Sequence, residues 1–264
     1  MARLSEGTIS REAPEVPYQV NATNSFTGYL AANLLAGNEF IDVSAYVDNP
    51  AGIGLYDALD EAIYQNPMIG RIYEVKYLSA EQALAINYRD SRESIVAEQE
   101  AVAAEVARII DEIVTDGMSD REKVQAINDH IRGIVTYNYE ALDQIRTGAY
   151  LVRQWEHART GSAAGALLDG SAVCAGYADA FKVLADAAGL EAVVVNGVVT
   201  SSGERHAWNK VNVDGTWRMI DVTWNDSDAA PNAYFLLTDV QSAESHEEHT
   251  DWIMDSLIGN FAAH

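Results

Sequence analysis

The sequence predicts an α+β protein, and three observations carry that prediction. Apolar residues recur at helical spacing through 91–134, and β-branched residues dominate the strands expected between 191 and 223. Asp214-Gly215 lies between two of those strands and is a strong two-residue hairpin signal. We expect three parts along the chain: a polar tail over 1–25, a small α+β unit over 26–90 and a larger domain over 91–264.

The composition is that of a globular protein with an acidic surface. The chain has 264 residues, of which 48% are hydrophobic, so it is long enough to bury a sizeable core. Its 40 acidic and 17 basic residues give a net charge of -23, which would repel phosphate backbones. We therefore expect no nucleic-acid partner, and we interpret the charge mainly as a solvated surface.

The sequence says little about compartment. No run reaches the ~18 apolar residues that a membrane span needs. The first eight residues lack the apolar segment of a secretory signal, and a single cysteine cannot form an internal disulfide. We expect a soluble chain without a transmembrane segment. The sequence does not specify the compartment, and a secreted or cell-surface protein is among the alternatives. It does not specify the oligomeric state either.

In the first 90 residues, Pro14 and Pro17 discourage regular structure in the tail. The β-branched and aromatic run 40–47 predicts a strand. Apolar residues at helical spacing then predict a helix over 55–65, closed by Asn66-Pro67. Alternating residues predict two half-buried strands, over 73–77 and 84–88.

The larger domain opens with helical patterns. We expect a helix over 91–115 with one apolar stripe, made of Val96, Ala103, Val106, Ile110 and Ile113. Ser119 and Glu122 have the spacing of a capping box, which predicts the start of a second helix. Residues 140–169 predict a loop with short helices. A helix from Cys174 to Ala188, capped by Gly189, is followed by strands over 191–199, 206–213 and 216–223.

Cys174 is a candidate nucleophile because a glycine-bearing loop leads into a helix at this residue. The unpaired N–H groups and the dipole of a helix N-terminus stabilise a thiolate. The small neighbours Ala172, Ala175 and Gly176 would leave room for a substrate backbone. On its own, however, a lone cysteine in a helix is more often a buried structural residue.

The hairpin relates two further residues. With a two-residue turn at Asp214-Gly215, Trp208 lies opposite Asp221 and His206 opposite Thr223. His206 and Asp221 then share one face as diagonal neighbours, about 7 Å apart, so the carboxylate can orient the imidazole. The alternatives are a half-buried histidine without a special role and a strand-end Asx motif at Asp221.

Three motifs together resemble the core of the transglutaminase-like superfamily. They are Val173-Cys174-Ala175-Gly176-Tyr177-Ala178, His206-Ala207-Trp208-Asn209 and Trp217-Arg218-Met219-Ile220-Asp221-Val222-Thr223-Trp224. The resemblance covers about residues 91–240. It implies a papain-like fold in which the helix of the cysteine packs against an antiparallel sheet that bears the histidine and the aspartate. Residues 91–264 would then form a transglutaminase-like catalytic domain.

The resemblance also implies roles. Cys174 would be the nucleophile, His206 its base and later acid, and Asp221 the group that holds the imidazole. The family's oxyanion stabiliser, a tryptophan or a glutamine upstream of the cysteine, has no matching motif here. Trp155, Gln154, Tyr137 and the backbone N–H of Cys174 are the candidates. The candidates for a substrate groove are Trp208, Trp224, Tyr177, Trp155 and Tyr137.

These residues predict an enzyme that transfers the acyl group of a protein or peptide amide through a Cys174 thioester, without a cofactor. Water as acceptor gives hydrolysis, and a lysine amine gives cross-linking. We favour hydrolysis slightly because nothing in the sequence marks a lysine channel. The alternative is a non-catalytic binding or scaffolding module that keeps the fold.

Two acidic motifs resemble metal sites only loosely. His246-Glu247-Glu248-His249 lacks the spacing of a zinc motif and a third ligand, so we expect a solvated acidic helix there. The acidic run from Asp221 to Asp228 does not match a calcium-binding loop. We therefore predict no metal site.

Overall fold

The computed structural model describes residues 12–48, 52–146, 159–227 and 230–249. The chain divides into two compact units, Met1–Val96 and Ala97–His264. The boundary falls inside the long helix α3 (Arg92–Ile113). No helix among the described residues is long and apolar enough to cross a membrane.

The first unit is a small α+β structure. Its antiparallel sheet has the order β1-β3-β2, formed by Phe40–Asp42, Ala83–Tyr88 and Ile72–Leu78. Helices α1 (Ser25–Leu35) and α2 (Leu55–Gln65) supply the rest of its core, together with the short 3-10 helix η1 (Ser44–Tyr46). The buried side chains of this core include Phe26, Tyr29, Leu30, Leu34, Ile41, Leu84 and Ile86.

Sequence patterns located most of these elements. The helix over 55–65 and the strands near 73–77 and 84–88 are present. The predicted strand over 40–47 is too long, because β1 ends at Asp42, whose Oδ1 accepts the Ser44 N–H at 2.8 Å and turns the chain into η1. Helix α1 was not predicted. It begins at the N-cap Asn24, whose side chain accepts the N–H groups of Phe26 and Thr27.

The segment before α1 is not a free tail throughout. The backbone N–H of Asn21 donates to Asn66 Oδ1 at 2.8 Å, and Asn66 Nδ2 returns a bond to the Asn21 carbonyl at 2.9 Å. Thr23 bonds to the buried Glu61 through its N–H, at 2.7 Å, and through its hydroxyl. These bonds attach residues 21–23 to helix α2.

The second unit begins with helices. The capping box at Ser119 and Glu122 is present at the start of α4 (Asp120–Ile134). The expected apolar stripe of α3 is shifted, because Val102, Val106 and Ile109 are buried whereas Val96 is 41% exposed. Further along lie α5 (Tyr139–Arg146), the 3-10 helix η2 (Arg159–Gly161), α6 (Ala163–Leu167) and the parallel pair β4 (Thr136–Tyr137) and β5 (Ser171–Ala172).

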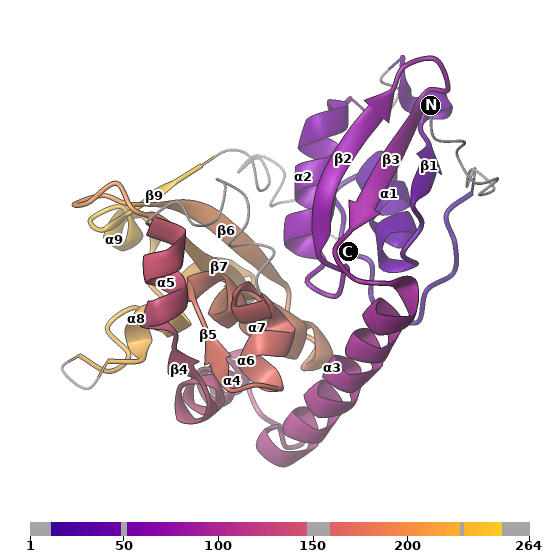
Figure 1. Cartoon of the computed structure of the whole chain (residues 1–264). Coiled ribbons are helices and arrows are strands. Elements are labelled where there is room, and N and C mark those ends of the chain that lie inside the picture. Colours follow the sequence, from indigo (N-terminus) through magenta and orange to yellow (C-terminus); the bar gives the residue numbers. More distant parts are fainter. Residues whose placement is uncertain (1–11, 49–51, 147–158, 228–229, 250–264) are drawn as a thin grey trace. The chain divides into compact units, whose positions relative to one another are not determined.

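A four-stranded antiparallel sheet with the order β8-β7-β6-β9 carries the helix α7 (Cys174–Ala187) (Figure 1). Its strands are Thr216–Ile220, Arg205–Val213, Ala192–Val199 and His246–Glu248. Val194 and Ala207 on the sheet pack against Cys174 and Ala178 of α7. Asn209 Nδ2 donates to the Ala178 carbonyl at 3.0 Å, which ties β7 to the helix. This is the helix-on-sheet fold that the resemblance implied.

The β7–β8 hairpin confirms the predicted turn. Asp214 and Gly215 have φ of 51° and 79°, as a type I′ turn requires, and Val213 pairs with Thr216. The register continues as predicted as far as Asn209 opposite Ile220. The predicted strand to 223 is too long, however, because Asp221 is the N-cap of the short helix α8 (Val222–Asn225). Thr223 therefore lies in α8, outside the ladder in which it was predicted to face His206.

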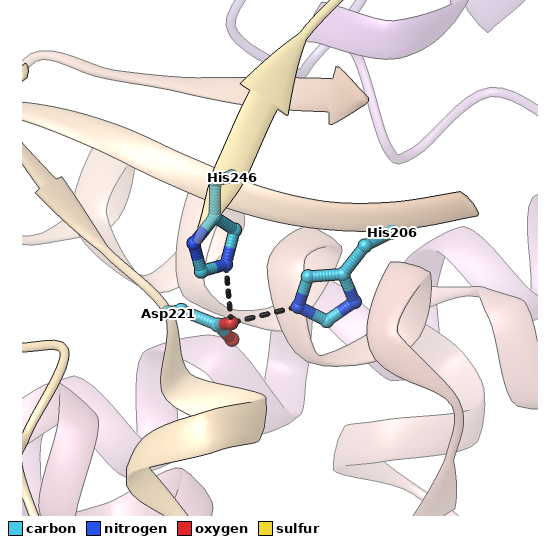
Figure 2. A group of neighbouring side chains, drawn as sticks. All are labelled: His206, Asp221 and His246. Atoms are coloured by element: carbon cyan, nitrogen blue, oxygen red, sulfur yellow. Dashed lines mark hydrogen bonds and ion pairs between the residues drawn. The ribbon is translucent and has the colours of Figure 1, made fainter. Parts of the chain in front are cut away.

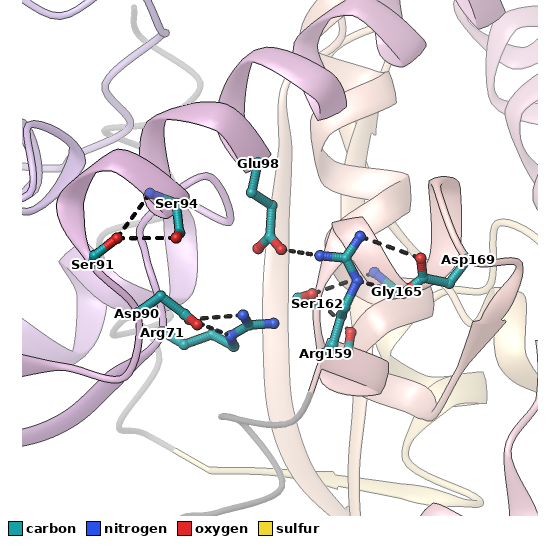
Figure 3. A network of polar contacts seen from close by, with 9 residues as sticks. All are labelled: Arg71, Asp90, Ser91, Ser94, Glu98, Arg159, Ser162, Gly165 and Asp169. Atoms are coloured by element: carbon teal, nitrogen blue, oxygen red, sulfur yellow. Dashed lines mark hydrogen bonds and ion pairs between the residues drawn. The ribbon is translucent and has the colours of Figure 1, made fainter.

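Polar contacts hold the chain that leads to Cys174 (Figure 3). The guanidinium of Arg159 contacts the carboxylates of Glu98 in α3 and Asp169, and Ser162 caps α6 by accepting the Gly165 N–H. The Val173 N–H donates to the Thr160 carbonyl at 2.8 Å. The first unit has its own pair in the same picture, in which Arg71 binds Asp90 at 2.7 Å. Each pair orders a connection within its own unit.

Candidate active site

Cys174 is the first residue of helix α7. The N-cap Val173 has extended backbone and no side-chain bond to the helix, so the first-turn N–H groups are not capped by that residue. Cys174 is a free cysteine with 6% of its surface exposed. The N-terminal end of the helix therefore places its partial positive charge beside a nearly enclosed sulfur.

Gly176 was expected to leave room for a substrate backbone, but in the structure it allows close packing of neighbouring backbone. A Cβ at Gly176 would lie 2.7 Å from the Thr160 carbonyl oxygen and 2.8 Å from the Ala172 Cβ. The glycine thus lets the η2 segment pack closely against the first turn of α7. Its role in this structure is close packing that supports the cysteine.

His206 lies on β7 with 6% of its surface exposed and places Nε2 2.7 Å from Asp221 Oδ2. Burial alone would lower the pKa of His206, but the Asp221 carboxylate, with a smaller contribution from Cys174, raises the pKa to about 10. The contribution of Cys174 to this pKa indicates that its side chain lies near the His206 ring. Because Nε2 is engaged with Asp221, Nδ1 is the ring nitrogen available to the thiol.

Asp221 is completely buried, and both of its oxygens are used. Oδ1 accepts the Trp224 N–H at 3.1 Å and so caps α8, which realises the Asx motif that had been the alternative reading. Oδ2 accepts from His206. Burial alone would raise the pKa of Asp221, but the charge and hydrogen bonds of His206, helped by His246, lower it to about 2. The carboxylate is therefore an ionised acceptor.

His246 is the residue of this site that sequence reasoning missed. It lies on β9, opposite Val199 of β6, so the predicted solvated helix over 246–249 is wrong. The residue is 3% exposed, and its Nε2 lies 3.2 Å from Asp221 Oδ2 (Figure 2). No local pattern marks it, because the β6–β9 pairing joins segments almost 50 residues apart.

His206, Asp221 and His246 are also the described residues that could hold a metal ion. Their three ligand atoms lie within 4.8 Å of one another. Two hydrogen bonds to one carboxylate oxygen already account for this clustering. A metal bound to His206 Nε2 would separate that nitrogen from Asp221, so the cluster is better explained by the hydrogen bonds.

A cavity of about 710 Å³ opens beside His206. Its walls include Tyr137 and Trp224, two of the predicted groove residues, together with Tyr139, Arg205, Asp226 and Tyr234. The cavity thus brings polar and aromatic side chains together next to the imidazole.

Two other predicted groove residues belong to the interior. Tyr177 is 1% exposed, and its hydroxyl donates to Asp226 Oδ2 at 2.9 Å. Trp208 is also 1% exposed, with its ring beside those of His206 and His246. Neither residue lines the cavity, because helix and sheet packing cover both rings. The remaining candidates, Trp155 and Gln154, lie outside the described residues.

Comparison with known proteins yields one family model and several relatives. The model of the transglutaminase-like superfamily matches residues 107–222, a segment that contains Cys174, His206 and Asp221 and stops short of His246. The mouse protein named kyphoscoliosis peptidase is 27% identical over 138 residues, which are 48% of this chain and 19% of that protein. The chain thus spans about a fifth of that relative's length.

Two solved structures are similar at low identity. One is described as a TGase and is 17% identical, with a TM-score of 0.41, over 64% of this chain and 48% of its own. The other, a candidate cysteine protease from Cytophaga hutchinsonii, is 17% identical, with a TM-score of 0.37, over 56% of this chain and 41% of its own.

The family match supports an enzyme of the transglutaminase-like kind in general terms and specifies no reaction. It also agrees with the three motifs from which the resemblance was first drawn. The segment 107–222 of this chain, with its helix-borne cysteine and strand-borne histidine, matches the model of the transglutaminase-like superfamily.

Proposed function

We propose that the protein is a thiol-dependent enzyme that cleaves an amide bond of a protein or peptide through a thioester on Cys174. The observation that carries this proposal is the buried series Cys174, His206 and Asp221, in which an electrostatic interaction links Cys174 to His206 and a hydrogen bond links His206 to Asp221. The last link is a hydrogen bond of 2.7 Å, and Asp221 and Cys174 together raise the pKa of His206 to about 10. Such a histidine is protonated at neutral pH and favours a thiolate beside it.

In the first step the Cys174 thiolate attacks the carbonyl carbon of the amide, and the carbonyl oxygen gains the negative charge. The backbone N–H of Cys174 lies in the first turn of α7, where a helix leaves N–H groups without an intrahelical partner, and we assign it as a donor to this oxygen. Tyr137 lines the cavity and packs against the cluster that contains Cys174, which makes it the side-chain candidate for a second donor.

The amide C–N bond then breaks, and the imidazolium of His206 gives its proton to the departing amine. This leaves a thioester and a neutral imidazole. In the second step His206 removes a proton from the acceptor as the acceptor attacks the thioester, and the Cys174 thiolate is restored. Asp221 holds the imidazole in the Nε2–H form throughout and stabilises its charge.

Hydrolysis, with water as the acceptor, is the reaction that we favour over transfer to a lysine. The cavity beside His206 is open enough to admit water, and its charged residues include Glu204, Arg205 and Asp226. None of the described cavity residues forms a narrow apolar channel of the kind that would exclude water from a thioester.

The direct test is the pH dependence of alkylation of the cysteine by iodoacetamide. We expect fast labelling at pH 5 to 6, well below the ordinary thiol pKa of about 8.5, and none in Cys174→Ala. Since alanine is smaller than cysteine and Cys174 is in a packed cluster, thermal unfolding should check that the variant keeps its fold. A labelling curve that rises only near pH 8 would contradict the proposal and favour a binding module.

The substrate class is tested by incubating wild type and Cys174→Ala with a mixed proteome. Mass spectrometry then reads new peptide termini, deamidated glutamine and lysine cross-links in one experiment. We expect new termini that depend on Cys174. Cross-links without new termini would replace hydrolysis by transfer, and identical samples from both proteins would argue against an amide substrate.

A further inference from the structure

His246 is a polar residue that the mechanism above does not require, yet the fold buries it against the site. Its side chain is fully enclosed, and its Nε2 lies 3.2 Å from the Asp221 oxygen that also accepts from His206. It comes from β9, outside the segment that the family model covers. A fully buried polar group with this placement calls for a role.

The hydrogen bonds determine the proton positions on His246. Asp221 is ionised, and a carboxylate only accepts, so His246 Nε2 must carry a hydrogen. In the neutral ring Nδ1 is then an acceptor, and Ser245 Oγ lies 2.8 Å from it. For the neutral ring the order is therefore Ser245 hydroxyl to His246 to Asp221, with each donor pointing toward the carboxylate.

The carboxylate is thereby held from three directions. The Trp224 N–H binds Oδ1, while His206 and His246 both bind Oδ2 (Figure 2). Trp208 and Trp224 enclose the His246 ring, with ring centroids 4.7 and 4.6 Å away. This packing leaves the imidazole of His246 little freedom to turn away from Asp221.

We propose that His246 is a positioning residue that acts through Asp221. It holds Oδ2 in the direction of His206, so that the imidazole stays in place opposite Cys174. The inference rests on the proposed thiol mechanism. The effect of His246 reaches the His206 imidazole through two hydrogen bonds in series, and it reaches the sulfur only through that imidazole.

The test compares alkylation of Cys174 against pH in wild type, His246→Phe and His246→Gln. Phenylalanine keeps a flat ring without a donor, whereas glutamine restores an N–H. We expect the acid limb of the His246→Phe curve to move up by about one pH unit, which lowers the rate at pH 5 about tenfold, because the thiolate fraction changes tenfold per unit. His246→Gln should recover much of this loss.

His249→Phe is the control, since His249 is a half-buried histidine three residues further along whose backbone N–H bonds to the Asn196 carbonyl. An acid limb that stays in place in a folded His246→Phe protein, or moves to lower pH, would overturn the inference. If wild type itself shows an ordinary thiol curve, the proposed function fails instead, so the two failures are distinguishable.

A second measurement does not depend on the thiol. Long-range nitrogen–proton NMR spectra of the histidine rings should show His246 in the Nε2–H form, and Ser245→Ala should weaken that preference. An Nδ1–H form in the wild type would overturn the hydrogen-bond order on which the inference depends.

Discussion

Two buried carboxylates in this protein titrate in opposite directions. Glu61 of α2 is 1% exposed, and Thr23 is the partner whose N–H and hydroxyl it accepts. Burial raises its pKa, and these bonds only partly offset the rise. Asp221 is 0% exposed, but His206 and His246 outweigh burial and lower its pKa to about 2.

The difference shows that burial alone does not mark a functional carboxylate. Both oxygens of each carboxylate accept hydrogen bonds, so what separates Asp221 from Glu61 is its cationic partner His206. Glu61 joins the segment before α1 to α2, which is a structural task. Asp221 accepts a hydrogen bond from His206, which in the proposed mechanism orients the imidazole.

The largest expected difference between Asp221 and Glu61 is in enzymatic activity. Asp221→Asn should reduce the activity of the enzyme about 10³- to 10⁴-fold, because the amide cannot stabilise the imidazolium and favours the wrong tautomer. The matched change Glu61→Gln should leave activity within about twofold, the scale of a substitution remote from the site. Steady-state kinetics on a peptide substrate measures both, and a similar loss in the two variants would remove the distinction.

The next effect is on stability. The raised pKa of His206 contributes stability that is complete below pH 6.5 and is lost as pH rises through about 10. The lowered pKa of Asp221 contributes stability that is complete above pH 3.8 and is lost as pH falls through about 2. Wild type should therefore exceed Asp221→Asn by about 3 kcal/mol at pH 4 to 6.5, the scale of a broken buried ion pair.

Urea unfolding at a series of pH values measures this difference. The difference should shrink as pH rises from 6.5 to about 10 and as pH falls from 3.8 to about 2. A difference that stays constant from pH 3 to pH 10 would show that the pair is not ionised in the folded protein.

Glu61 should behave in the opposite way. Because its pKa is raised, the stability linked to its protonated form is complete below pH 4.5 and is lost as pH rises through the raised value. Glu61→Gln mimics the protonated form and should raise the free energy of unfolding at pH 7 by up to about 1 kcal/mol, with no gain at pH 4. Glu81→Gln, at an exposed position between β2 and β3, is the control and should leave the free energy of unfolding unchanged at both pH 7 and pH 4. A lower free energy of unfolding for Glu61→Gln than for wild type at pH 7 would contradict the raised pKa of Glu61.

The smallest effect concerns the turn that sets the register of Asp221 but has no counterpart near Glu61. Gly215 has φ of 79°, so Gly215→Ala should cost about 1 kcal/mol. Gly133→Ala in α4 meets no atom within 4 Å and should instead gain up to about 1 kcal/mol. Thermal unfolding compares the stability changes of the two variants. Equal changes would show that the turn does not require a glycine at position 215.

Much of the site could be predicted because its signals are local. Asp214-Gly215 dictates a turn through the φ values of two residues, and the alternation along β7 and β8 follows from that turn. The capping box of α4 and the start of α7 at Cys174 likewise depend on a few neighbouring residues. By these means the sequence predicted the hairpin that brings Asp221 toward His206.

Tertiary structure decided the contacts between residues that lie far apart in the sequence. The pairing of β9 with β6 brings His246 to Asp221, and packing of α7 buries Tyr177, whose hydroxyl binds Asp226. Even the end of β8 was decided this way, because Asp221 takes a helix N–H and two imidazoles as partners instead of continuing the ladder. Local propensity reaches only a few residues, whereas these contacts depend on which distant segments bury their surfaces together.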